Sequence, residues 1–283
     1  MRSNMKKLLL ALSLLFTSFL FPQTDSTDNM WLYSAVAGIN INQIALSNWA
    51  AGGDNAISWT FVSNAKADYK SLPWILKNTF KLQYGRTKLG SDDYRTNDNE
   101  LYLENVLSYS VGLVVDPFFS NSVRTYVSSG FDYKAEPVKK TADFFDPGYI
   151  TQSIGFTYNK SKAITSRIGI GFQETITNVY RQYADDPETP FELESFRLDT
   201  GIESVTNSEI TLDDNLLFTS MLRLFSTFKE LDVWDVRWDN TISAKVNKYI
   251  TVNINVLTVY EKRQSPKTQL KEALQLGIVY TIF

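Results

Sequence analysis

The chain of 283 residues contains no cysteine and no histidine. Without cysteine it has no disulfide, no thiolate metal site, no nucleophilic thiol and no lipid-modified amino terminus. Without histidine it lacks serine–histidine triads, HExxH metal sites and the usual general base near neutral pH. We therefore expect no metal centre and no cofactor.

The chain also lacks an excess of positive charge. It carries 28 lysine and arginine residues against 31 aspartate and glutamate residues, which gives a net charge of -3. A protein that binds nucleic acid usually presents a basic surface, so we expect no nucleic-acid partner. The mean hydropathy is slightly negative, which excludes a bundle of transmembrane helices.

One long apolar run is present, over residues 8–21, and it follows the basic residues Arg2, Lys6 and Lys7. A basic start before a short apolar core is typical of a secretory signal peptide. The run is shorter than the roughly 20 residues that a membrane-spanning helix needs. We expect a signal peptide over 1–23 and a short extension over 24–32. The alternative is a retained amino-terminal anchor.

From residue 33 to residue 283 the dominant hydrophobic period is two, which indicates β-strands. The last segment shows this best, because Leu274, Leu276, Ile278 and Tyr280 share one face. The opposite faces carry glycine, serine, threonine, asparagine and paired charges, as the interior of a membrane barrel does. Aromatic residues gather near the expected strand ends, where two belts would meet the membrane interfaces. Beside the short turns these are Tyr69, Trp74, Tyr109, Phe118, Phe119, Tyr158 and Tyr249, and towards the longer loops they are Trp59, Tyr84, Tyr133, Phe172, Phe196, Trp234 and Tyr260.

The pattern predicts an all-β fold, a transmembrane antiparallel up-and-down β-barrel of about twelve strands. Tight turns are expected at 71–72, 159–162, 206–207 and 247–248, and residues 116–119 are expected to link two strands. Asp214 interrupts one apolar face, and a bulge there would restore the phase. The expected strands cover 33–45, 56–70, 73–87, 98–113, 122–134, 148–158, 163–176, 195–205, 208–223, 232–246, 249–261 and 268–283.

The segment ININQIALSNWAAGGDNAISW, residues 39–59, is the most distinctive stretch of the chain. It resembles the start of an uncharacterised family of Bacteroidota outer-membrane proteins that carry an NWAAGG-[DE]-N signature after a signal peptide. The resemblance implies an outer-membrane barrel and supplies no activity, substrate or catalytic residue. The matching positions are Asn42, Gln43, Leu46, Asn48, Trp49, Ala50, Ala51, Gly52, Gly53, Asp54 and Asn55.

The carboxyl terminus is similar to the assembly signal of outer-membrane barrels, which is a terminal aromatic residue after alternating apolar residues. It departs from the common pattern in its phase. Tyr280 and Ile282 share the apolar face here, whereas the terminal Phe283 does not.

The NWAAGGDN stretch is expected to form a loop between the first two strands. Gly52 and Gly53 permit positive φ, and Asp54 can bond neighbouring amides. One hypothesis is a ligand contact or gate at the barrel mouth, formed by Asn48, Trp49, Gly52, Gly53 and Asp54. The alternative is a tight structural turn with an interfacial tryptophan.

The expected inward faces carry charges of both signs. Mixed signs favour ion pairs across the lumen that narrow or plug it, whereas a pore selective for one charge would show an excess of the opposite sign. The alternative is a charge ladder that guides a zwitterionic or anionic solute. We expect Arg197, Arg223 and Arg237 to form a basic strip that faces Asp199, Asp235 and Asp239. The other inward charges are Lys66, Asp68, Lys77, Lys81, Glu104, Arg124, Asp132, Arg167, Glu203, Asp213 and Lys245.

The acidic loop around 185–194 is expected to be a solvated loop, because it lacks the spacing of a known calcium loop. The leading interpretation is a non-enzymatic protein of the cell outer membrane, in contact with its lipid, with a narrow or plugged channel for small solutes. The first alternative is a structural or accessory barrel that docks beside other outer-membrane proteins. The second is a barrel-type hydrolase, for which the chain offers no motif.

Overall fold

The computed structural model describes residues 30–47, 53–161, 163–186, 189, 192–263 and 265–282. The expected signal peptide and most of the short extension lie outside these residues. Within them, no helix is long and apolar enough to cross a lipid bilayer. The strands are β1 (Trp31–Ile44), β2 (Ala56–Ser71), β3 (Trp74–Leu89), β4 (Arg95–Tyr109), β5 (Asp116–Thr125), β6 (Gly130–Asp132), β7 (Lys139–Ala142), β8 (Gly148–Tyr158), β9 (Ile164–Ile176), β10 (Phe196–Asp213), β11 (Leu216–Thr227), β12 (Asp235–Lys245), β13 (Ile250–Tyr260) and β14 (Gln269–Thr281).

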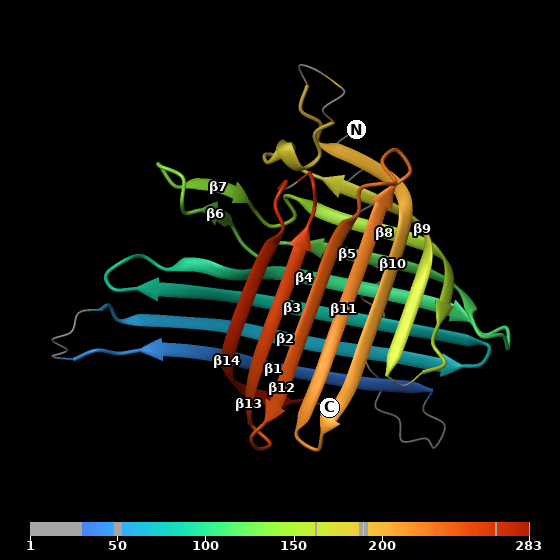
Figure 1. Cartoon of the computed structure of the whole chain (residues 1–283), viewed down its shortest axis with the longest axis horizontal. Coiled ribbons are helices and arrows are strands. Elements are labelled where there is room, and N and C mark those ends of the chain that lie inside the picture. Colours follow the sequence, from blue (N-terminus) through green and yellow to red (C-terminus); the bar gives the residue numbers. More distant parts are fainter. Residues whose placement is uncertain are drawn as a thin grey trace. The chain divides into compact units, whose positions relative to one another are not determined.

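Twelve of these strands form one closed antiparallel barrel, which confirms the expected fold class. Each barrel strand pairs with its neighbours along the chain, and β1 closes the barrel against β14 through the register Val36↔Thr281 to Ile41↔Leu276. In Figure 1 the blue and green strands β1–β5 form one wall, and the orange and red strands β10–β14 cross it obliquely. The short hairpin of β6 and β7 belongs to the connection between β5 and β8, outside the barrel sheet.

The connections alternate in length around the barrel. β2 and β3 are joined by two residues, β10 and β11 by two, and β12 and β13 by four, whereas residues 126–147 and 177–195 form long loops at the other end. β1 begins and β14 finishes at the end with the short connections. This asymmetry is the one expected for outer-membrane barrels.

The expectation that residues 116–119 link two strands is wrong. They begin β5, where Phe118 is 4% exposed and points into the barrel while Phe119 is 50% exposed on the outer side. Asp116 is fully buried. Its carboxylate is stabilised there by hydrogen bonds from Lys160 Nζ at 2.7 Å and from the amide of Val111 at 3.1 Å. Phe118 therefore belongs to the interior and not to an aromatic belt. Pro117 is tolerated because it lies at the start of the strand.

The prediction of one continuous strand over residues 122–134 is also wrong. β5 ends at Thr125, and residues 130–132 belong to the small hairpin. Asp132 is exposed there and does not face the lumen. The alternation continues through both segments, so the pattern did not reveal the break between them.

The expected turn at 206–207 is also wrong. β10 runs without interruption from Phe196 to Asp213, and the chain reverses at Asp214 and Asn215. Threonine suits a strand, whereas an aspartate–asparagine pair suits a turn. The register shifts between Thr211 and Asp213, which is where a bulge restores the phase of the apolar face.

Small residues allow close approach of the strands in one part of the wall. Gly155 of β8 lies opposite Gly169 of β9. A Cβ atom at Gly155 would lie 2.1 Å from the carbonyl oxygen of Ile168, which no side chain permits. Glycine is therefore required at this position for the two strands to pair as they do.

Candidate functional site

Charged side chains from several strands line the lumen, and one carboxylate joins opposite walls. Glu100 of β4 accepts a hydrogen bond from Arg237 Nη2 of β12 at 2.7 Å. Arg124 Nε of β5 lies 3.1 Å from the other carboxylate oxygen, as an ion pair without an aligned hydrogen bond. The three side chains are 13–27% exposed. They form a charged bridge from β4 and β5 to β12.

A second cluster is built around Glu203 of β10. Its carboxylate accepts a hydrogen bond from Arg223 Nε of β11 at 2.7 Å and another from the hydroxyl of Ser153 of β8. Arg223 also donates through Nη2 to Gln173 Oε1 of β9 at 2.8 Å. Four neighbouring strands are thereby tied together inside the barrel, because each partner lies on an inward position of its strand.

Two further pairs complete the network. Glu104 accepts hydrogen bonds from Arg167 of β9 and from the hydroxyl of Tyr102, the latter at 2.8 Å. Lys271 of β14 contacts one carboxylate oxygen of Asp98 of β4. The other carboxylate oxygen accepts a hydrogen bond from the hydroxyl of Thr60 of β2 at 3.0 Å. The first pair joins β4 to β9 and the second joins β4 to β14, so each links strands that are not neighbours in the barrel sheet. Such paired charges define geometry more reliably than they add stability.

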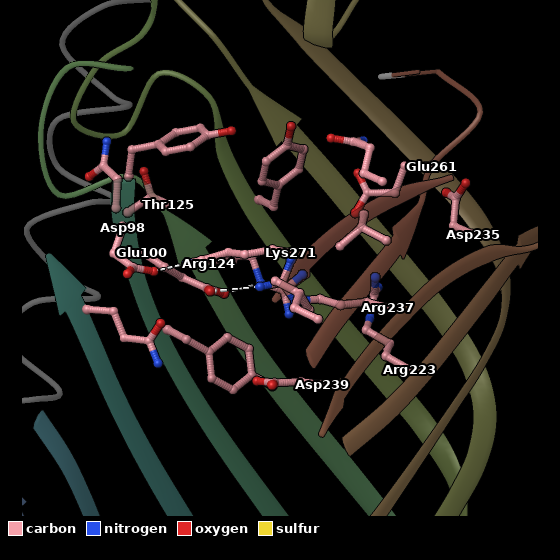
Figure 2. A pocket seen from close by; sticks show the side chains of 18 of the residues that line it. Asp98, Glu100, Arg124, Thr125, Arg223, Asp235, Arg237, Asp239, Glu261 and Lys271 are labelled. Atoms are coloured by element: carbon pink, nitrogen blue, oxygen red, sulfur yellow. Dashed lines mark hydrogen bonds and ion pairs between the residues drawn. The ribbon is translucent and has the colours of Figure 1, made fainter. Parts of the chain in front are cut away.

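A cavity of about 350 Å³ lies in the lumen, and the network forms part of its lining. Figure 2 shows Asp98, Glu100 and Arg124 on one side of this cavity and Arg223 and Arg237 on the other. Both signs of charge therefore face the same small space. A cavity of this size holds a small solute and excludes a large one.

The structure brings the six predicted lumen residues into this region. Arg223, Asp235, Arg237 and Asp239 line the larger cavity. Arg197 and Asp199 line a smaller adjoining cavity of about 30 Å³. Their part in solute passage stays a prediction.

The expected facing of the arginines and aspartates is only partly present. Arg197 Nε donates to Asp199 at 2.8 Å, as the strip model requires. Arg223 pairs instead with Glu203, and Arg237 pairs with Glu100. The reason is that the closest carboxylates come from the opposite wall or from the next strand.

Sequence reasoning missed Asp98, Glu100 and Lys271. A signal for two of them was present, because Asp98, Glu100 and Glu104 share the same parity along β4, and Glu104 was placed inward. Lys271 likewise shares its parity along β14 with Gln275, which lies on the face opposite the apolar residues. The alternation identifies which side chains enter the lumen, but it does not show which of them meet.

The NWAAGGDN stretch lies in the connection from β1 to β2. The amide of Leu46 donates to Asn55 Oδ1 at 2.6 Å, and the amide of Gly90 donates to the carbonyl oxygen of Asn55 at 2.7 Å. Gly53 has a φ of 118°, a conformation that glycine adopts readily. A Cβ atom on Gly90 would contact Asp54. The described part of this loop is therefore tied to the loop between β3 and β4.

Asn48, Trp49 and Gly52 lie outside the described residues, so the gate hypothesis stays a prediction. Gly53 and Asp54 are in the position that a loop at the barrel mouth requires, since they follow the end of β1 that carries the longer connections. Their contacts are equally those of a structural turn.

The acidic loop is organised by hydrogen bonds. The amide of Asp186 donates to Glu194 at 3.0 Å. Partial desolvation and the neighbouring Glu194 raise the pKa of Asp185 above its ordinary value. In the part of the chain that the structure describes, no group of three or more acidic side chains is arranged to hold a metal ion.

Residues 41–131 match the model of a family described as a protein of unknown function, DUF3078. No curated protein matches the chain. Among solved structures, an outer-membrane channel from Pseudomonas putida F1 is 10% identical with a TM-score of 0.38, covering 92% of this chain and 99% of that one. The translocator domain of the autotransporter NalP from Neisseria meningitidis is 8% identical with a TM-score of 0.35, covering 99% and 95%. The KdgM porin is 10% identical with a TM-score of 0.31, covering 88% and 99%.

The matched family has no assigned function. This agrees with the expected resemblance to an uncharacterised family, and the match includes the NWAAGGDN stretch. The Bacteroidota source and the signature itself stay predictions. The likenesses to solved structures bring no activity to this chain.

Proposed function

We propose that the chain is an outer-membrane barrel whose lumen forms a narrow passage for small solutes, restricted by charged side chains, and that it performs no catalysis. The observation that carries this proposal is the bridge from Glu100 to Arg237 across the barrel, beside a cavity of about 350 Å³. The barrel provides a path through a membrane, and the bridge narrows it.

The membrane location is supported by the outer surface of the barrel. On β14 the outward residues Leu274, Leu276, Ile278 and Tyr280 are 54–66% exposed, whereas Gly277 between them is buried. Exposed apolar side chains on a continuous face are costly in water. Lipid acyl chains are a favourable surrounding for these side chains. The barrel backbone can also lie in lipid, because a closed barrel makes its backbone hydrogen bonds internally.

Aromatic pairs border this apolar surface at two levels on β3. Trp74 stacks edge-on against Tyr109 with 4.9 Å between ring centroids, and Tyr84 lies in the same way 5.9 Å from Trp59. The ten residue steps from Trp74 to Tyr84 span about 25 Å of membrane thickness once the tilt of the strand is included. That distance agrees with the apolar band of outer-membrane barrels.

The lining suggests which solutes pass. Both signs of charge face the cavity, so an ion of either sign meets repulsion as well as attraction. A small zwitterionic or neutral polar solute meets partners for both its donors and its acceptors. We therefore favour such solutes over large or strongly charged ones.

Liposome swelling tests this proposal with purified protein. We expect liposomes that contain the protein to admit glycine and arabinose and to exclude raffinose, because the cavity is small and its charges are balanced. Empty liposomes provide the background. Passage of raffinose as fast as arabinose, or no passage of glycine and arabinose, would overturn the proposal.

A further inference from the structure

Four amide side chains lie next to one another on the outer surface of the barrel. Asn78 of β3 is opposite Asn105 of β4, Asn105 is opposite Asn121 of β5, and Asn121 is opposite Gln152 of β8. We call these residues the amide row. The row crosses four neighbouring strands along the direction of their hydrogen bonds.

Their inward neighbours show that these amides face outward. Glu104 precedes Asn105 and binds Arg167 inside the barrel. Ser153 follows Gln152 and donates to Glu203 inside the barrel. Since successive side chains in a strand point to opposite faces, the amides between such residues point outward.

The row lies within the apolar surface. On each strand it is preceded and followed, two residues away, by an outward apolar residue. These flanking residues are Leu76 and Phe80 on β3, Leu103 and Leu107 on β4, Phe119 and Val123 on β5, and Ile150 and Ile154 on β8, of which Ile150 is only 8% exposed. An amide in contact with acyl chains loses its hydrogen bonds to water and is costly unless it finds another partner.

The row satisfies only part of its own hydrogen-bonding capacity. Asn105 Nδ2 donates to Asn78 Oδ1 at 2.7 Å, and Asn78 Nδ2 donates to the carbonyl oxygen of Ala67 at 2.6 Å. The side chains of Asn121 and Gln152 make no hydrogen bond within the described part of the chain. The amide donors and carbonyl acceptors of Asn121 and Gln152, at one end of the row, are therefore available to a partner.

In the described part of the chain, the other strands carry no such row of amides on the outer surface. β13 and β14 present only apolar outward residues at their centres, namely Val252, Ile254 and Val256 on β13 and Leu274, Leu276 and Ile278 on β14. Asn240 of β12 is an outward amide without an amide beside it, since its register partners are Ser220 and Val256. Outward hydroxyls do lie beside Asn240, since Ser220 is its partner on β11 and Ser208 is the partner of Ser220 on β10. Among the described residues, side-by-side amides are found on the outer surface from β3 to β8.

We propose that the amide row is the interface of a homodimer in the membrane, in which a second copy of this chain docks the same row. Amides carry donors and acceptors together, so a row of them is complementary to itself, as a two-fold interface requires. The strands are inclined to the barrel axis, so two rows related by a two-fold axis along the membrane normal cross at their centres. Asn105 of each copy then meets Asn121 of the other. This inference rests on the proposed membrane location.

The test compares the protein with its Asn105→Leu/Asn121→Leu variant in mild detergent and in membranes, by sedimentation and by chemical cross-linking. We expect the unchanged protein to be dimeric and the double variant to dissociate about tenfold more readily, because two interfacial hydrogen bonds per copy are lost. Asn240→Leu is the matched control, as it makes the same exchange on the outer surface away from the row, and it is expected to remain dimeric.

Folding and membrane insertion are followed separately by heat-modifiable migration and by membrane fractionation. A double variant that is folded and inserted but no longer dimeric supports the inference. A monomeric unchanged protein, a dimer that persists in the double variant, or a different protein bound at the row would overturn it. If the chain is not in the membrane fraction at all, the proposed location fails, and fractionation shows this independently of the dimer.

Discussion

Replacing Glu100 with alanine is expected to raise the single-channel conductance severalfold and to shift its selectivity towards anions. Glu100 is the shared partner of Arg124 and Arg237 across the lumen. Without it the two guanidinium groups repel each other and turn towards water, which widens the passage. The lumen also gains positive charge, which favours anions.

Planar-bilayer recordings at low and moderate salt measure both quantities. The matched control is Glu230→Ala, which removes a carboxylate from an exposed ion pair with Lys262 in the loops. That variant is expected to conduct as the unchanged protein does. If Glu100→Ala leaves conductance and selectivity as they were, the bridge does not restrict the passage.

Replacing Glu104 with alanine is expected to reduce the free energy of unfolding by about 3–5 kcal/mol, because it leaves a buried arginine without its partner. Glu104 and Arg167 are 11% and 10% exposed, and Tyr102 loses its acceptor as well. Urea-induced unfolding in lipid vesicles measures the change. Glu104→Gln keeps an acceptor for Tyr102 and is expected to lose less.

Glu209→Ala provides the comparison for this prediction. Glu209 pairs with Lys66 at 3.2 Å, but the two side chains are 57% and 53% exposed. A hydrated pair of this kind contributes about 1 kcal/mol or less. Equal losses for Glu104→Ala and Glu209→Ala would show that burial of the Arg167 pair has no special weight.

The strand number and the facing of most strands could be predicted because alternation is a local property. Leu274 to Tyr280 show it within seven residues, and the high exposure of Leu274, Leu276, Ile278 and Tyr280 confirms that these side chains share a face. The error at 122–134 arose because the alternation passes unchanged through the boundary between β5 and β6. At 116–119 and 206–207 the error was the opposite one, an interruption expected inside the continuous strands β5 and β10. At such places turn chemistry decides, as Asp214 and Asn215 show.

The partners inside the lumen could not be predicted in the same way. Glu100 and Arg237 are 137 positions apart. Their contact depends on how far the sheet is sheared when it closes, and no single strand encodes that quantity. The amide row was hidden for the same reason, since each amide alone interrupts one apolar face and only the register places four together.

The most direct test of the central claim is the contact of alternate β14 residues with lipid and water. The chain has no cysteine, so single cysteines at Leu274, Gln275 and Leu276 accept one spin label each. Collisions with oxygen should be most frequent at positions 274 and 276, and collisions with a water-soluble nickel chelate should be most frequent at 275. Equal accessibility at all three positions in membranes would contradict a barrel that turns its apolar face to lipid.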